Sequence, residues 1–202
     1  MANGKVCTGF SMPRVAKYGV TEGAVTYTSG MPLARGVEVS LEVEAGDDNN
    51  FYADNVIAEG SSGIFTSGTV TLTVDGLKEA ARKLIMGITA NSTIEVGGET
   101  VDVIDYDDTM VIPYVGIGFV VRFMEDGVTT FAPMVLTKCK FAIDGLSAAT
   151  QEDVIEFQTQ ELTATVNRDD STNHTWRRIA ADQTTEAAAV AILDAMLNIT
   201  GA

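Results

Sequence analysis

The sequence predicts a mainly β fold: a twisted β-sandwich or barrel with one packed helix and one C-terminal helix. Two segments alternate apolar and polar residues with a period of two, and a third region carries a well-signalled hairpin. The chain has 202 residues, of which 46% are hydrophobic and 20% are charged, which suits one domain with a real core. We expect an N-terminal arm (1–17), a β-sandwich domain (18–183) and a C-terminal helix (184–202).

The segment 37–44 is the clearest strand. One of its faces holds Val37, Val39, Leu41 and Val43, and the other holds Glu38, Ser40, Glu42 and Glu44. Residues 69–75 repeat the pattern, with Val70, Leu72 and Val74 inward and Thr69, Thr71, Thr73 and Asp75 outward. The polar faces are either the wet outer side of a sandwich or the lining of a water-filled channel. The pattern alone does not separate these two readings.

A long insert, 45–68, joins these two strands, although a turn of a few residues would connect them. Its polar residues are Asp47, Asp48, Asn49, Asn50 and Asp54, and its large apolar residues are Phe51, Tyr52, Val56, Ile57, Ile64 and Phe65. Aromatic anchors among polar groups are typical of interfaces, so we expect a mobile loop that docks on a neighbouring molecule. The alternative is that the insert folds back on its own subunit.

Turn residues predict two hairpins, 18–35 with turns at Gly23 and Gly30, and 115–143 through the tight turn Asp126-Gly127. Residues 94–104 are either a strand pair or one irregular strand around Gly97-Gly98. A further strand covers 154–167. Its inward set begins as Ile155 and Phe157 and ends as Leu162, Ala164 and Val166, so we expect a bulge near 158–161.

Two helices are predicted. The first covers 77–86, with Asp75 as its N-cap and Gly87 as its stop. The second covers 185–198 after a polar loop, 168–183. It is apolar nearly all round, so we expect it to be buried, with a subunit interface as one possible place.

The sequence contains no recognisable catalytic motif. The lone histidine, His174, is expected in a surface loop. We expect no export signal, so Cys7 and Cys139 are expected to be separate free thiols. The acidic runs 47–50 and 105–108 lack the spacing of an EF-hand and are expected to be solvated loops. We therefore expect no enzymatic activity, metal or cofactor.

The net charge of −15 restricts the partners. Nucleic acid and anionic membranes both require Lys and Arg, so an acidic surface is not expected to grip either of them. The same surface would let DNA pass without sticking. No apolar stretch approaches ~20 residues, so no membrane span is expected.

Four stretches carry a family resemblance: 2–10 (ANGKVCTGF), 33–37 (LARGV), 47–55 (DDNNFYADN) and 68–77 (GTVTLTVDGL). They resemble the major tail proteins, or tail tube proteins, of long-tailed phages and prophages of Gram-positive bacteria. The resemblance is densest over 2–88. It implies a tail-tube β-sandwich or barrel with a flanking helix, as in the tube of type VI secretion.

The resemblance also implies a function. Subunits of this family form hexameric rings, and the rings stack into a tube around a tape-measure protein, between a baseplate and a tail terminator. DNA passes through the lumen. For this chain the expected place is the virion tail, assembled in the bacterial cytoplasm. The expected lumen-facing residues are Glu38, Ser40, Glu42, Glu44, Thr69, Thr71 and Thr73. The insert 45–68 is expected to make the main contact between stacked rings.

Two other classes stay open. A carbohydrate- or cell-surface-binding β-sandwich would present exposed aromatic side chains, whereas aromatics make up only 7% of this chain. An enzyme with a carboxylate pair, such as a glycosidase, is the third reading, although the sequence does not name its pair. Assembly into rings or tubes would separate the first class from the others.

Overall fold

The computed structural model describes residues 4–89, 91–151 and 157–200, which form a mainly β fold consistent with a β-sandwich. Its strands are β1 (Val6–Thr21), β2 (Ala24–Pro32), β3 (Gly36–Ala45), β4 (Asn49–Ala53), β5 (Val56–Ser61), β6 (Phe65–Val74), β7 (Ser92–Val96), β8 (Glu99–Val103), β9 (Val115–Glu125), β10 (Val128–Phe141), β11 (Gln160–Asn167) and β12 (Arg177–Ile179). Its helices are α1 (Glu79–Met86) and α2 (Glu186–Met196).

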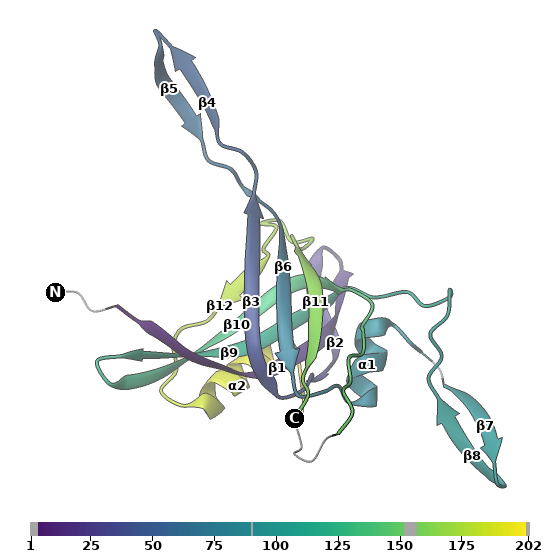
Figure 1. Cartoon of the computed structure of the whole chain (residues 1–202). Helices are drawn as coiled ribbons and strands as arrows, with labels where there is room; N and C mark the ends of the chain where they lie inside the picture. Colours follow the sequence, from purple (N-terminus) through teal and green to yellow (C-terminus); the bar gives the residue numbers. More distant parts are fainter. Residues whose placement is uncertain (1–3, 90, 152–156, 201–202) are drawn as a thin grey trace.

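The main sheet has eight strands in the order β2-β1-β9-β10-β11-β6-β3, with β12 paired to β10. Figure 1 shows β3, β6 and β11 crossing in front of β1, β9 and β10, so the sheet folds into two layers. Side chains from both layers meet in one core that includes Val15, Leu72, Val74, Ile117, Leu136, Phe141 and Leu162. We call β1, β9 and β10 the covered layer, and β3, β6 and β11 the open layer.

The covered layer is buried on both faces, because α2 packs on its outer side. In β9, Ile117 and Phe119 join the core between the layers, whereas Val120 joins a second cluster with Leu193 and Leu197. A Cβ at Gly118 would lie 2.7 Å from side-chain atoms of both Leu193 and Leu197. Glycine at this position therefore lets the helix approach the strand.

Helix α2 packs on its own subunit. The Thr185 side chain caps it by accepting a hydrogen bond from Ala188 N at 3.3 Å. Asp194 Oδ1 lies 3.0 Å from Nε of the buried Arg14, which ties the helix to β1. The expected burial holds for one face only, since Ala187, Ala191 and Ala195 are exposed.

Helix α1 confirms the first predicted helix, with Ala81, Ile85 and Met86 buried. Gly87 ends it in the left-handed conformation, at φ 72°. The N-cap is Lys78, not Asp75, so that expectation is wrong. Asp75 instead accepts a hydrogen bond from Arg35 N at 2.9 Å and pairs with its guanidinium.

The expected N-terminal arm over 1–17 is wrong for residues 6–17. They form the first part of β1, which pairs with β2 on one side and with β9 on the other. Arg14, Val15 and Ala16 are buried there. The mixed composition of residues 6–17 gave no strand signal, because the burial of this strand depends on β9, which lies far along the chain.

The turns at Gly23, Gly97-Gly98 and Asp126-Gly127 are confirmed, but Gly30 lies inside β2. A Cβ at Gly30 would come within 2.4 Å of Ile199 Cγ1, so packing explains this glycine. The expected bulge near 158–161 is wrong, because β11 begins at Gln160 and pairs with β6 in unbroken register.

Two further expectations, on the strand 154–167 and on the polar loop 168–183, differ in part from the structure. Phe157 is 93% exposed and therefore does not belong to an inward set, whereas Ile155 lies outside the described residues. The polar stretch 168–183 contains the short strand β12, which pairs with β10.

Candidate assembly surface

The outer side of the open layer carries the residues that the sequence assigned to a lumen. Glu38, Ser40, Glu42, Glu44 and Thr69 are exposed, and Thr71 and Thr73 are half-buried. On the opposite side of β6, Val70, Leu72 and Val74 are fully buried. The predicted division into a polar and an apolar face is confirmed for β6. In β3 the predicted inward face is only partly covered, because Val39 and Leu41 are half-buried whereas Val37 is 56% exposed and Val43 46% exposed.

Cross-strand pairing extends this surface over β11, which the sequence analysis did not assign. The aligned rows are Glu38–Thr73–Glu161, Ser40–Thr71–Thr163 and Glu42–Thr69–Thr165. Directly opposed residues of antiparallel strands point to the same side. We call these residues together with Glu44 the polar face. Alternation along 160–166 was visible in the sequence, but only the strand order places β11 beside β6.

The polar face carries negative charge, and positive charge begins only at its border with β10. Four glutamates, Glu38, Glu42, Glu44 and Glu161, lie on it, and among the described residues none of them pairs with Lys or Arg. The first cations come from β10, where Lys140 is opposite Thr165. The result is an anionic, hydroxyl-rich surface over the three strands of the open layer.

The insert 45–68 is a β-hairpin and not the expected loop. Strands β4 and β5 pair through the two-residue turn Asp54-Asn55, at φ 50° and 66°, which is typical of a tight primed turn. Figure 1 shows this hairpin projecting beyond β3 and β6, away from the body. Its base is held by Gly46 N donating to Ile64 O at 2.9 Å and by Gly63 N donating to Asp48 Oδ1 at 2.7 Å. Pairing satisfies the backbone groups that a solvated loop would leave to water.

The residues expected in a stacking contact fall into three groups. Asp47, Asp48, Asp54 and Ile64 are exposed. The side chains of Asn49, Asn50, Phe51 and Tyr52 lie outside the described residues, although their backbone forms β4. Phe65 is corrected: its half-buried ring stacks on Trp176, with centroids 4.4 Å apart and planes within 4°. The Phe65 ring therefore packs within its own subunit and is not free to contact another ring of subunits.

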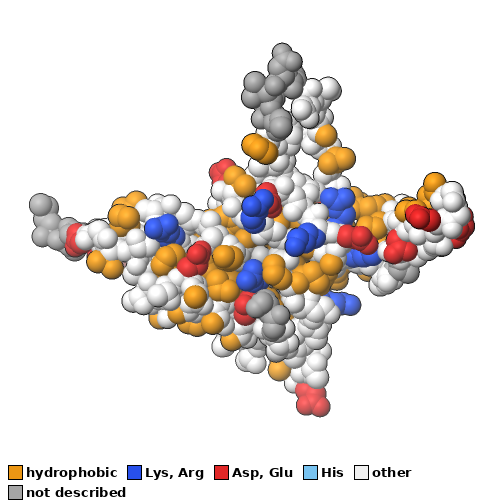
Figure 2. Space-filling view, turned by 90° about the horizontal axis from the view of Figure 1, so that it is seen from below, with side chains coloured by type: hydrophobic (Ala, Val, Ile, Leu, Met, Phe, Trp, Pro, Cys, Tyr) orange, Lys and Arg blue, Asp and Glu red, His pale blue; other side chains and the backbone are white. Residues whose placement is uncertain are grey.

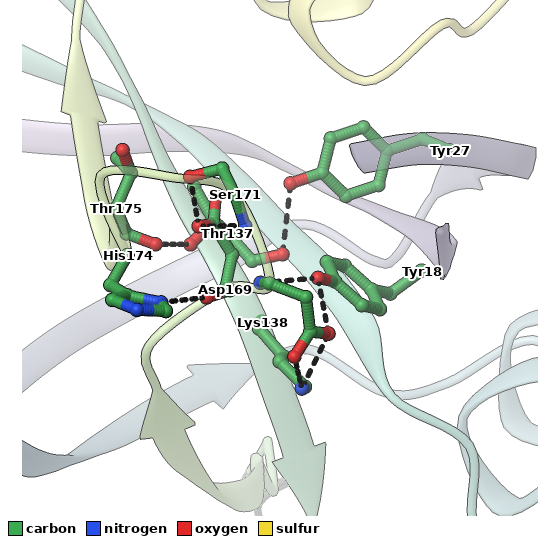
Figure 3. Close-up of polar contacts among 9 residues, drawn as sticks. Tyr18, Tyr27, Thr137, Lys138, Asp169, Ser171, His174 and Thr175 are labelled. Carbon is green, nitrogen blue, oxygen red and sulfur yellow. Dashed lines mark hydrogen bonds and ion pairs between the residues drawn. The ribbon is translucent and has the colours of Figure 1, made fainter. Parts of the chain in front are cut away.

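A polar cluster ties the loop 168–176 to the covered layer (Figure 3). The Tyr27 hydroxyl donates to Thr137 O at 2.8 Å, and Thr137 Oγ1 donates to Thr175 O at 2.6 Å. The Tyr18 hydroxyl donates to Asp170 Oδ2 at 2.8 Å. Burial raises the pKa of Tyr18 to about 12 and raises the pKa of Tyr27 further.

Charge also enters this cluster. Lys138 Nζ lies 2.8 Å from Asp170 Oδ2 and sits over the rings of Tyr18 and Tyr114. The hydrogen bond from Lys138 lowers the pKa of Asp170. Asp169, only 1% exposed, accepts from Ser171 N at 3.1 Å through Oδ1. These contacts fix the loop against β1 and β10.

The histidine and the cysteines take ordinary places. His174 is exposed, as expected, and its Nδ1 lies 3.1 Å from Asp169 O (Figure 3). Cys7 is exposed in β1 and Cys139 is buried in β10, both as free thiols. Burial raises the pKa of the Cys139 thiol. Groups of three or more His, Cys, Asp or Glu placed to hold a metal ion do not occur among the described residues.

Across the described ranges, neither helix is long and apolar enough to cross a membrane. A scan against protein-family models and a search of curated proteins gave no match. The geometry of the polar face and of the projecting hairpins is therefore the basis for a functional argument.

Proposed function

We propose that this chain is a structural, self-assembling protein: the tail tube subunit of a long-tailed phage, which stacks as hexameric rings around a DNA-conducting lumen. The polar face is the observation that carries the proposal. Its glutamates repel phosphates within about a Debye length, ~8 Å at physiological salt, which leaves passing DNA mobile. Its hydroxyls keep the surface wet without adding positive charge.

The strand order supports a ring. β3 ends the described path of the main sheet at one side and β2 ends it at the other. A ten-residue edge strand such as β3 presents unpaired backbone groups that a neighbouring chain can use. Extending the sheet from copy to copy would carry the polar face around a closed channel.

The β4–β5 hairpin is proposed as the contact between stacked rings. It projects from the end of the open layer, so it can reach a copy stacked beyond that end (Figure 1). Replacing Phe51 and Tyr52 together by Ala should leave the subunit folded and stop the tubes from elongating. Full-length tubes from this variant would contradict the stacking role.

Other partners follow from the family resemblance and belong to the same proposal. They are a tape-measure protein inside the tube, a baseplate at one end and a tail terminator at the other. The tube would assemble in the cytoplasm of the bacterial host and function in the virion tail. DNA would cross the lumen without specific binding.

Electron microscopy of the purified protein tests the proposal. Negative staining over a range of concentrations should show rings or hollow tubes. Monodisperse monomers at every concentration would contradict it, and binding of such monomers to glycans would favour a carbohydrate-binding module instead.

The lumen assignment has a separate test. Tubes that carry Glu38→Lys, Glu42→Lys and Glu161→Lys should retain DNA at low salt and release it at high salt, because three cations per subunit would then face the channel. A matched variant, Glu125→Lys, changes an exposed charge in β9, outside the polar face, and should not retain DNA. Equal retention by the two variants would contradict the assignment.

A further inference from the structure

The second projecting hairpin, β7–β8, has an apolar face with no cover. Paired residues place Ile94 beside Val101, and Val96 and Val103 lie on the same side of the two strands. Ile94 is 51% exposed, Val96 57% and Val101 44%. An isolated two-stranded hairpin is marginally stable in water, so such a face is expected to pack against something.

The hairpin is acidic on both faces. Glu99 is opposite Val96 and shares the apolar face, whereas Glu95 and Asp102 lie on the other face, and the sequence has no Lys or Arg from Ser92 to Val103. The Thr100 hydroxyl donates to Glu95 Oε1 at 2.6 Å across the strands. Figure 2 shows hydrophobic and acidic side chains together on this arm, at the right of the view.

The body of the same molecule carries a surface of opposite charge. A hollow of about 620 Å³ lies between β1, β2 and the start of α1. Met12, Met31, Pro32 and Ala80 supply apolar walls. The charged residues of the lining are Arg14, Arg35, Lys78 and Asp75, so cations outnumber carboxylates three to one. The Arg35 side chain is 90% exposed although it pairs with Asp75. The view from below in Figure 2 shows hydrophobic side chains interleaved with Lys and Arg over the middle of this face.

We propose that the β7–β8 hairpin of one copy docks into this hollow on a neighbouring copy, with Ile94, Val96 and Val101 inward and Glu99, on the same face, toward Arg35 and Lys78. Charge complementarity selects a second copy as the occupant, since every chain supplies both halves. The hairpin points away from its own body (Figure 1), which favours contact between chains. The proposal rests on the proposed function in requiring that subunits assemble.

The geometry of such a contact has a consequence for assembly. It is heterologous, because the hairpin and the hollow are different patches of the same surface. Heterologous contacts build rings where the rotation closes and open polymers where it does not. The β7–β8 hairpin would therefore join neighbouring subunits in addition to the contact at the β3 edge. Its role would be distinct from that of the β4–β5 hairpin.

Disulfide trapping tests the docking directly. In a Cys7→Ser background, one preparation carries Val96→Cys and another carries Ala80→Cys; the two are mixed, assembled and oxidised. We expect a disulfide-linked pair containing one copy of each variant. A chain that carries both cysteines and closes only on itself would overturn the proposal, because it would place the hairpin in its own hollow.

The outcomes separate this docking from the proposed function. Rings or tubes that form without the crosslink would overturn the docking alone. A wild-type chain that stays monomeric at every concentration would overturn both.

Substitutions test the two components of the contact. Ile94→Ser should raise the concentration needed for half-assembly about tenfold, equivalent to about 1.4 kcal/mol. Val128→Ser, at a 63% exposed valine in the β9–β10 hairpin, is the matched control and should leave it unchanged. An equal shift in both variants would contradict docking through Ile94.

Charge exchange supplies the second readout. Glu99→Lys should weaken assembly, as should Lys78→Glu. A chain that carries both changes restores opposite charges at this contact and should assemble near the wild-type concentration. Assembly of that variant no better than either parent would contradict the assigned charge pairing.

Discussion

The covered and open layers belong to one sheet, yet they differ in what lies on their outer sides. In the covered layer, residues Val115 to Val121 of β9 are all buried, because the core lies on one side and α2 on the other. In the open layer, β6 buries Val70, Leu72 and Val74 and turns threonines outward. A continuous apolar run thus indicates a strand that is buried on both faces, whereas strict alternation indicates a strand that is buried on one face.

The two layers differ in how much their outer faces contribute to stability. The covered layer gains from burial on two sides and from a helix seated on glycines. The open layer keeps one face free for contact with solvent or with other molecules. Substitutions on the two layers should therefore have very different effects on the free energy of unfolding.

The largest effect is expected at the centre of the α2 contact. Leu193→Ala removes a fully buried side chain that packs beside Gly118, and should lower the free energy of unfolding by about 2–5 kcal/mol. Urea denaturation followed by circular dichroism measures this loss. A loss below about 1 kcal/mol would mean that the helix contributes little to the covered layer.

A smaller loss is expected from the strand side of the same contact. Gly118→Val places a Cβ 2.7 Å from Leu193 and Leu197, so α2 must shift outward. Overpacking of this kind should cost about 1–3 kcal/mol. Calorimetry should show a lower Tm, and an unchanged Tm would show that the helix position is adjustable.

Two tyrosines, Tyr18 in β1 and Tyr27 in β2, should make stability fall at high pH. The pKa of Tyr18 is 10.0 in the unfolded chain and about 12 in the folded one, because burial disfavours the phenolate. Its stabilising contribution is complete below pH 10 and is lost as pH rises toward 12, since the unfolded chain releases its proton first. The raised pKa of Tyr27 acts in the same direction.

Urea midpoints measured from pH 9 to 12 for the wild type and for Tyr18→Phe with Tyr27→Phe test this effect. The variant should show a shallower decline, because neither phenylalanine titrates. Parallel curves for both proteins would assign the alkaline instability to other groups.

The smallest effect is expected on the polar face. Thr165→Ala changes an exposed side chain of β11 and should alter the free energy of unfolding by no more than about 0.5 kcal/mol. Urea denaturation beside Leu193→Ala makes the comparison of layers direct. A loss of several kcal/mol would show that the open layer's outer face has a structural partner within the subunit.

Several elements of the fold could be predicted because their signals are local. The alternation in 37–44 and 69–75, the stop at Gly87 and the turn at Asp126-Gly127 all depend on residues within one strand, helix or turn. Phe65 and Phe157 show the limit. Both are aromatic residues beside strands, and one stacks on Trp176 while the other is 93% exposed.

The candidate surface divides in the same way. The polar side of β3 and β6 was readable from parity, whereas the contribution of β11 required the strand order. The insert 45–68 was recognised as too long for a turn, but its pairing into β4 and β5 was not. The sequence signal for that hairpin was the Asp54-Asn55 pair, whose side chains tolerate positive φ.

By itself, the sequence determined the mainly β class, the inward and outward faces of individual strands, the two helices and the acidic balance. These properties follow from periodicity and composition, which act over a few residues. Tertiary structure alone decided that the N-terminal segment is a central strand, that α2 covers β9 and β10, and that β11 completes the polar face. Those outcomes depend on contacts between residues far apart in the sequence, such as Arg14 and Asp194, which are 180 positions apart. No local pattern specifies which distant strand will satisfy an edge, because any exposed strand offers the same backbone groups.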